Sequence, residues 1–240
     1  MKKNKILLPL ASLTAAIGVA TPLVTLTSCS KSPEITVDDV LDIDSNGVLY
    51  GFKDDVTDSQ IKTVFGDTFT IPKKVTSIAR YAFCNANKTT IPSFIKHFKF
   101  EDGYQCKVIE EYAFAYNPFE SIEFTNERNH PTSEESPEVA TSWALVDGGW
   151  GLKRLATHSF YHSNNLTRLT ACSSIEDIPE VGDLPYLFGW DEWSEVGYIN
   201  KTNINYVDFS DCVFSNLEIE TKFISNWIAH CQQILGYGLQ

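Results

Sequence analysis

The chain has little positive charge for its size and lacks the short motifs that mark common enzymes. Its 19 lysine and arginine residues stand against 31 aspartate and glutamate residues, a formal net charge of −12 at pH 7. A protein this acidic does not bind nucleic acid by releasing counterions from phosphates. No HExxH, GxSxG, P-loop or GxGxxG sequence occurs, so no motif indicates a zinc protease, a serine hydrolase or a nucleotide site.

The N-terminal residues have the layout of an export signal that ends at a cysteine. Lysines stand at positions 2, 3 and 5, a mostly apolar stretch follows, and Leu26-Thr27-Ser28 precede Cys29. These last residues resemble the lipobox of bacterial lipoproteins. In that family the cysteine thiol receives a diacylglyceryl group and the chain is cut just before it. The resemblance implies that Cys29 begins the mature chain and anchors it, because two acyl chains are enough for stable membrane attachment.

A plain transmembrane anchor is the alternative for the same stretch. Residues 6–26 are long enough to span a bilayer. However, Pro9, Gly18 and Pro22 interrupt them, and Cys29 stands where a cleavage site belongs. Cleavage would remove three lysines and no acid, so we expect a still more acidic mature body that anionic lipid headgroups repel.

Cysteine chemistry is limited, because none of the six cysteines forms a CxxC pair. Neither a redox motif nor a paired-cysteine zinc knuckle is therefore present. If Cys29 is acylated, an odd number remains and they cannot all pair. We expect mostly buried free thiols, with one disulfide as the alternative. The remaining residues are Cys84, Cys106, Cys172, Cys212 and Cys231.

Four segments share a pattern in which an aliphatic residue precedes a phenylalanine by five positions. The phenylalanines are Phe83, Phe114, Phe160 and Phe209. A small residue directly precedes the first three, whereas Asp208 precedes the fourth. A second apolar pair such as Phe119 and Ile122 often follows. We expect stacked units, each with one short strand and one turn or helical segment, and the phenylalanines as an internal ladder. Chance recurrence in an aromatic-rich chain is the alternative.

The segments TIPKKVTSIARYAF, KVIEEYAFAYNPFESIEF and LKRLATHSFYHSNNLTRLT resemble BspA-like leucine-rich repeats. The opening LDIDSNGVLYGFKDDVTDSQIKTVFGDTFTIP is similar to the lead-in of surface lipoproteins from cell-wall-less bacteria. The resemblance covers roughly residues 45–210 and implies a leucine-rich-repeat solenoid, to which the spacing of C-terminal apolar residues adds an expected capping helix. Phenylalanine spacings of 31, 46 and 49 residues make this solenoid irregular, because the usual repeat is about 23 residues.

The ends and insertions divide the chain into expected parts. We expect a lipoprotein signal peptide at 1–28, a tether at 29–40, the repeat-like domain at 41–215 with insertions at 126–150 and 182–203, and a capping segment at 216–240. In the last part, apolar residues at helical spacing predict an amphipathic helix that covers the open end of the solenoid, with Gly236 as its C-cap. These residues are Phe223, Ile224, Trp227, Ile228, Cys231 and Leu235. A partner-binding helix is the alternative.

The first folded residues give two local signals. Asp42-x-Asp44-x-Asn46-Gly47 matches the first half of an EF-hand calcium loop, but Lys53 stands where calcium needs a bidentate carboxylate. Asn46-Gly47 between apolar runs favours a hairpin over residues 41–50 instead. Thr57 and Gln60 form a capping-box pattern that predicts a helix through Phe65.

Two histidines and four tryptophans are candidate functional residues. His158 and His162 lie four apart, as metal ligands on one helix face do. They flank Phe160, and the intervening HSFYH segment contains no carboxylate, so we expect surface histidines and no metal site. The tryptophans lie in the insertions beside glycine and acidic residues. Tryptophan is enriched in interface hot spots, so they are candidate ligand contacts, with filling of gaps as the alternative. They are Trp143, Trp150, Trp190 and Trp193.

The family resemblance implies a non-enzymatic protein without a cofactor, lipid-anchored at the outer face of the bacterial cell membrane. It implies adhesion to, or recognition of, a host or environmental macromolecule, with a host protein or a glycan as partner. The first alternative is a structural or antigenic coat lipoprotein with no fixed ligand. The second is a surface hydrolase without a recognisable motif. The oligomeric state is open.

Overall fold

The computed structural model describes residues 34–84, 90–124, 151–172, 174–175, 178, 187–195, 197–209 and 217–231. Within these ranges the side chains of residues 192–194, 197–200 and 219 are not described. The described residues from Ile35 onward belong to one compact unit. Cys29, Cys212, Leu235 and Gly236 lie outside the described residues.

The first folded residues form a hairpin between two short helices, α1 (Val37–Val40) and α2 (Asp58–Phe65). Strand β1 (Leu41–Ile43) pairs antiparallel with β2 (Val48–Phe52), which confirms the predicted hairpin. Asp44 Oδ1 accepts hydrogen bonds from the backbone N–H groups of Asn46 at 2.8 Å and Val48 at 2.9 Å. That carboxylate holds the turn.

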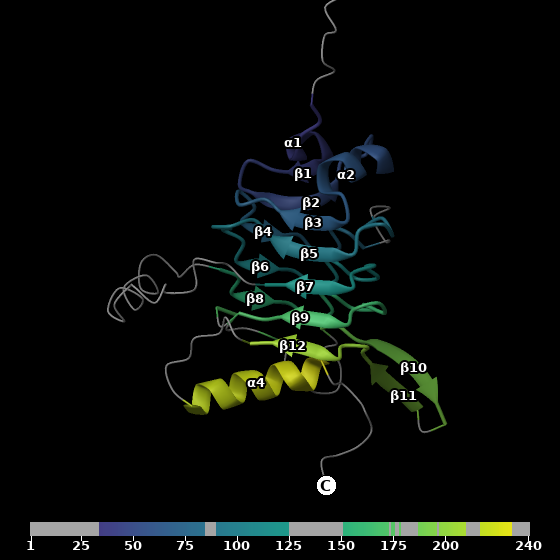
Figure 1. Cartoon of the computed structure of the whole chain (residues 1–240), viewed down its shortest axis with the longest axis vertical. Helices are drawn as coiled ribbons and strands as arrows, with labels where there is room; N and C mark the ends of the chain where they lie inside the picture. Colours follow the sequence, from purple (N-terminus) through teal and green to yellow (C-terminus); the bar gives the residue numbers. More distant parts are fainter. Residues whose placement is uncertain are drawn as a thin grey trace, which may run out of the picture. The chain divides into compact units, whose positions relative to one another are not determined.

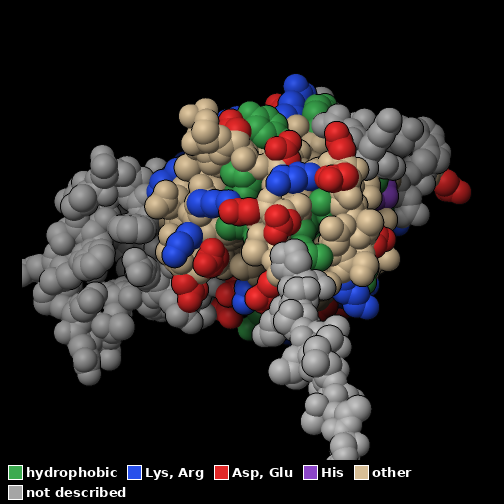
Figure 2. All heavy atoms as spheres, turned by 90° about the horizontal axis from the view of Figure 1, so that it is seen from above, with side chains coloured by type: hydrophobic (Ala, Val, Ile, Leu, Met, Phe, Trp, Pro, Cys, Tyr) green, Lys and Arg blue, Asp and Glu red, His purple; other side chains and the backbone are tan. Residues whose placement is uncertain are grey.

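Two side-chain details fix the local geometry of this region. Gly47 has a φ of +81°, and a Cβ atom there would lie 2.6 Å from the Lys74 carbonyl oxygen, so only glycine fits. At α2, Thr57 and Gln60 make the reciprocal capping-box bonds, which confirms the predicted helix start. Acidic and basic side chains are interspersed on this end of the molecule (Figure 2). Lys74 forms an ion pair with Asp38 of α1.

From β3 to β9 the chain alternates between two sheets, each of which has five strands (Figure 1). The first sheet has the order β1-β2-β4-β6-β8, with β4 at Ser77–Ile78, β6 at Val108–Ile109 and β8 at Arg154–Leu155. The second has the order β12-β9-β7-β5-β3, with β3 at Thr68–Ile71, β5 at His97–Phe100, β7 at Ser121–Glu123, β9 at Arg168–Thr170 and β12 at Tyr206–Asp208. Every neighbouring pair is parallel except β1 with β2.

This architecture shows that the predicted fold class, an irregular leucine-rich-repeat solenoid, is wrong. The structure has two mostly parallel sheets of five strands with few helices, rather than an irregular solenoid. The segments ending in Phe83 and Phe114 do not become helical, because Tyr81 and Tyr112 have φ values of +61° and +55°. A residue in the left-handed region ends a helical path, and the chain then crosses to the second sheet.

Matching apolar residues lie in register along both sheets. In the first sheet Leu49, Ile78, Ile109 and Leu155 are paired in sequence across the strands, and all four are buried. The second sheet has a matching row of paired, buried residues: Phe69, Phe98, Ile122 and Leu169. These rows belong to a single hydrophobic core. Because successive strand side chains point to opposite faces, this register sends the polar neighbours of each row outward.

A column of stacked phenylalanines fills the same core. The Phe83 and Phe114 rings lie 5.2 Å apart with their planes 7° from parallel, and Phe114 and Phe160 are 5.1 Å apart at 16°. The column continues with Phe188, 5.7 Å from Phe160, and not with Phe209. Phe209 is partly buried, and its ring lies 6.3 Å from that of Phe223.

Backbone hydrogen bonds explain why Phe188 takes the fourth place. The Phe83 N–H donates to the Ala113 carbonyl and the Phe114 N–H to that of Ser159, both at 2.7 Å. The Phe160 N–H donates in the same way to the Leu187 carbonyl at 3.0 Å. The segment at 187–188 is therefore the next layer of the column. Sequence matching missed it because Asp183, and not an aliphatic residue, stands five positions before Phe188.

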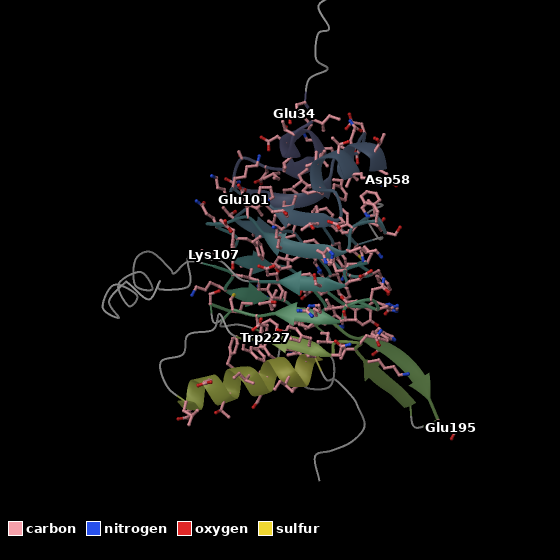
Figure 3. All side chains as sticks on the ribbon, in the orientation of Figure 1. Glu34, Asp58, Glu101, Lys107, Glu195 and Trp227 are labelled. Carbon is pink, nitrogen blue, oxygen red and sulfur yellow. The ribbon has the colours of Figure 1, made fainter. Side chains whose placement is uncertain are left out.

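The last described elements are a hairpin and a helix. Strands β10 (Trp190–Ser194) and β11 (Gly197–Lys201) pair antiparallel, and α4 runs over Leu217–Cys231. Helix α4 includes Trp227, whose ring is 5.9 Å from those of Phe124 and Phe188 (Figure 3). None of the helices in the described ranges is both long and apolar enough to cross a bilayer.

Buried thiols and one buried phenol complete the core. Cys84, Cys106, Cys172 and Cys231 are all buried and free, and burial raises the pKa of Cys106 to about 12. The Tyr104 ring stacks on another core ring at 4.1 Å. Its hydroxyl accepts a hydrogen bond from the Leu152 N–H at 3.0 Å and donates to the Phe124 carbonyl at 3.2 Å.

Candidate recognition surface

Aromatic side chains gather on the turns that lead from the first sheet to the second. These turns follow β4, β6 and β8, on the side of the sheets away from Lys107 (Figure 3). The hairpin of β10 and β11 adds one tryptophan. We call the set the aromatic face; its members are Tyr81, Tyr112, Tyr116, His158, Tyr161, His162 and Trp190. Tyr116 is 55% exposed and the others are half-buried, so the rings are accessible from solvent.

The rings form two columns joined by a seventh ring. In the first column, Tyr112 stacks on Tyr81 at 5.2 Å and on His158 at 4.7 Å. In the second, His162 stacks on Tyr116 at 4.7 Å and lies 6.4 Å from Trp190.

Tyr161 stands edge-on between the two columns. Its ring lies 6.3 Å from that of Tyr112 at 80° and 5.9 Å from that of Tyr116 at 89°. Stacked and edge-to-face pairs of this kind are each worth roughly 0.5–1.5 kcal/mol beyond the area they bury. The aromatic face is therefore one connected, pre-arranged surface.

The backbone beneath these rings adopts an uncommon conformation. Among the residues described, the non-glycine positions with positive φ are Tyr81, Tyr112, Tyr116, His158 and His162, at 55–64°. Every one of them belongs to the aromatic face. The left-handed region costs a residue with a side chain roughly 1–2 kcal/mol, and glycine avoids this cost.

Backbone hydrogen bonds between turns hold these strained positions. The Tyr81 N–H donates to the Glu111 carbonyl at 3.1 Å, and the Tyr116 N–H donates to the Tyr161 carbonyl at 2.7 Å. The His162 N–H donates to the Gly189 carbonyl, also at 2.7 Å. The turns are thus fixed to one another before any ligand binds.

Charged groups border the aromatic face, but two of its rings, Tyr161 and His158, stay uncharged. Asp191 Oδ2 accepts a hydrogen bond from the Tyr161 hydroxyl at 3.3 Å. Burial, with the charge of Asp191, raises the pKa of Tyr161 to about 12. Burial lowers the pKa of His158, an effect that the negative charges of Asp191 and Glu111 oppose. Both rings are therefore uncharged at neutral pH. Arg80 pairs with Glu111 at 2.7 Å.

A shallow groove of about 540 Å³ adjoins this surface, where strands of the second sheet begin. We call it the amide groove; it is lined by Lys96, Glu120, Asn164, Asn165, Thr167, Asn203 and Asn205. Lys96 Nζ lies 3.1 Å from Glu120 Oε1. The Asn164 N–H donates to the His162 carbonyl at 3.0 Å, so a lining residue of the groove directly follows the turn that carries the middle ring of the second column.

The predicted site residues are only partly placed by the structure. Trp190 joins the aromatic face, and Trp193 lies on β10 in register with Tyr198. Trp143 and Trp150, like Cys29, lie outside the described residues. His158 and His162 lie on a turn and stack on different tyrosines rather than sharing a helix face.

The tyrosines of the aromatic face were missed, although the sequence carries a signal for them. An aromatic residue stands two positions before the core phenylalanine in YAF at 81–83, YAF at 112–114 and HSF at 158–160. An aromatic residue also stands two positions after it at 116, 162 and 190. The pattern is visible once the inward phenylalanine is known, because it fixes which positions point outward.

Comparisons with protein-family models, with curated proteins and with solved structures found no match to this chain. What the aromatic face can bind therefore follows from its own chemistry. It offers flat apolar ring faces, phenol groups that donate and accept hydrogen bonds, and neighbouring amides and carboxylates.

Proposed function

We propose that this chain is a lipid-anchored surface protein that recognises a macromolecule through the aromatic face. The observation that carries the proposal is that all five left-handed, non-glycine positions in the described ranges bear aromatic rings, on one surface. Glycine would make each turn without backbone strain. Strained positions of this kind cluster at ligand sites, where the surroundings hold them in place.

The extent of the aromatic face favours a macromolecule over a small molecule. Its rings come from three successive turns and a hairpin, and they form a broad surface. Small-molecule sites are concave and enclose most of their ligand. Tyrosine and tryptophan give large contact areas at low conformational-entropy cost, which is why recognition surfaces use them. We accordingly place the protein among non-catalytic binding proteins.

The membrane part of the proposal rests on the leader and on charge. The residues before Cys29 support lipidation there, and residues 29–40 would serve as the tether. The body is strongly acidic, so anionic headgroups repel it and leave the aromatic face free for an external ligand. These two features support a binding surface on the outer side of the cell membrane.

The test uses the full-length chain in detergent micelles and an immobilised extracellular matrix that contains both proteins and glycans. Binding is measured by surface plasmon resonance for the wild-type chain and for Tyr116→Gly combined with Trp190→Ala. Glycine at 116 removes a 55%-exposed ring and keeps the left-handed backbone. The control is Tyr50→Ala, which removes a 49%-exposed tyrosine on β2, outside the aromatic face.

We expect wild-type affinity on the order of micromolar. The double variant should bind about tenfold or more weakly than the wild-type chain, as when hot-spot aromatics are removed. The control should bind with unchanged affinity. Equal binding by all three proteins would overturn the role of the aromatic face. No binding by the wild-type chain would overturn recognition altogether and favour a coat protein with no fixed ligand.

A further inference from the structure

We infer that the ligand of the aromatic face is a neutral glycan chain that continues into the amide groove. This inference rests on the proposed function and adds the chemical class of the ligand. It comes from the charge of the groove, the arrangement of its lining and its position beside the second ring column.

The amide groove carries no net charge in a strongly acidic chain. Its one base and one acid, Lys96 and Glu120, pair with each other at 3.1 Å. The rest of its lining is amide or hydroxyl: Asn164, Asn165, Thr167, Asn203 and Asn205. An amide side chain both donates and accepts hydrogen bonds, as a sugar hydroxyl does. A net charge of −12 repels anionic polymers, which favours a neutral ligand.

The lining also has an even spacing. Lys96, Glu120, Thr167 and Asn205 each directly precede a strand of the second sheet. Backbone hydrogen bonds link these four residues in order. The N–H of each later residue donates to the carbonyl of the residue before it in this series, at 2.6–3.1 Å. Neighbouring strands lie roughly 4.8 Å apart. An evenly spaced row of side chains suits a polymer with a repeating unit.

The second ring column supplies the apolar half of the site. Tyr116, His162 and Trp190 succeed one another along the turns, and Tyr116 is mostly exposed. The C–H face of a sugar ring packs against an aromatic face, because the ring quadrupole is negative there. His162 lies two residues before Asn164, which lines the amide groove, so a single glycan chain can contact both the second ring column and the groove.

The experiment uses the full-length chain in detergent micelles. It is screened on an array of neutral hexose and N-acetylhexosamine oligosaccharides, with sialylated and sulfated forms of the same chains for comparison. Affinity for the best neutral oligosaccharide is then measured by calorimetry for three variants. These are Tyr116→Gly, the pair Asn165→Asp with Asn205→Asp, and the control Asn226→Asp.

The asparagine variants are matched in chemistry. Asn165 and Asn205 are exposed in the groove, and Asn226 is exposed on α4, outside the groove. Each change to aspartate keeps the shape, replaces a donor with an acceptor and adds one negative charge. We expect the groove pair and Tyr116→Gly each to weaken binding about tenfold or more, as hot-spot changes do, and Asn226→Asp to leave it unchanged.

Three results would overturn the inference. Tighter binding of sialylated or sulfated forms would exclude a neutral ligand. Unchanged glycan affinity in the groove pair would exclude the amide groove. Binding only to matrix proteins, lost in Tyr116→Gly, would leave the proposed function intact and exclude a glycan. If no variant alters any binding, the proposed function falls as well.

Discussion

Replacing Phe188 with alanine should destabilise the protein more than replacing Phe209, although only Phe209 has the sequence pattern of the other column residues. Phe188 is fully buried, and its ring lies 5.7 Å from that of Phe160 and 5.9 Å from that of Trp227. Truncating a packed phenylalanine costs about 3–5 kcal/mol, and lost aromatic pairs place this site in the upper half of that range. We therefore expect a loss of about 4 kcal/mol.

The same reasoning gives a smaller loss for Phe209. It is only partly buried, and its ring lies 6.3 Å from that of Phe223, at the edge of the core. A partly exposed side chain gains less than the roughly 1.5–3 kcal/mol of full burial, so Phe209→Ala should cost about 1–2 kcal/mol. Urea unfolding followed by tryptophan fluorescence gives both free energies by linear extrapolation. An equal or larger loss for Phe209→Ala would refute the assignment of Phe188 to the column.

Three further outcomes are expected. Tyr104→Phe leaves the buried Leu152 N–H without its acceptor, so urea unfolding should show a loss of about 1–3 kcal/mol; no loss would mean that another acceptor replaces the phenol. Burial lowers the pKa of His158 in the folded state, so as the pH decreases through about 6.5 the unfolded state takes up the proton first. The free energy of unfolding should therefore decrease as the pH decreases. His158→Asn, which tolerates the left-handed backbone, should lessen that fall between pH 7.5 and 5.5 in the same assay, and an unaltered pH profile would contradict the shift. Cys29→Ser should abolish the lipid mass seen by intact-mass analysis and the partitioning into detergent; unchanged partitioning would exclude lipidation.

The parts that sequence reasoning obtained are those decided by nearby residues. Asn46-Gly47 fixes a turn within a few positions, and Thr57 with Gln60 fixes a helix start within one turn. Helix α4 contains the residues whose spacing predicted it, from Phe223 to Cys231. Each signal is local, so no distant partner is needed to interpret it.

The parts that were missed depend on contacts between distant residues. Ile78 and Phe98 both lie in short apolar stretches, and nothing near either residue shows that they belong to different sheets. Phe188 joins the column because the Phe160 N–H donates a hydrogen bond to the Leu187 carbonyl, although no aliphatic residue stands five positions before Phe188. The aromatic face was missed for a related reason, since Tyr81 occupies a left-handed position that usually indicates glycine.

The Tyr104 hydroxyl has a consequence for how the sequence can evolve. It binds the carbonyl of Phe124 and the N–H of Leu152, which flank the sequence insertion at 126–150, so the core itself holds together the two described segments on either side of that insertion. The entropic cost of holding two chain ends together grows slowly with the number of residues between them, by about 0.6 kcal/mol per doubling. Beyond it, Leu155 and Leu169 still pair in register with Ile109 and Ile122. Selection can therefore exchange or lengthen this stretch of sequence while the sheets keep their register.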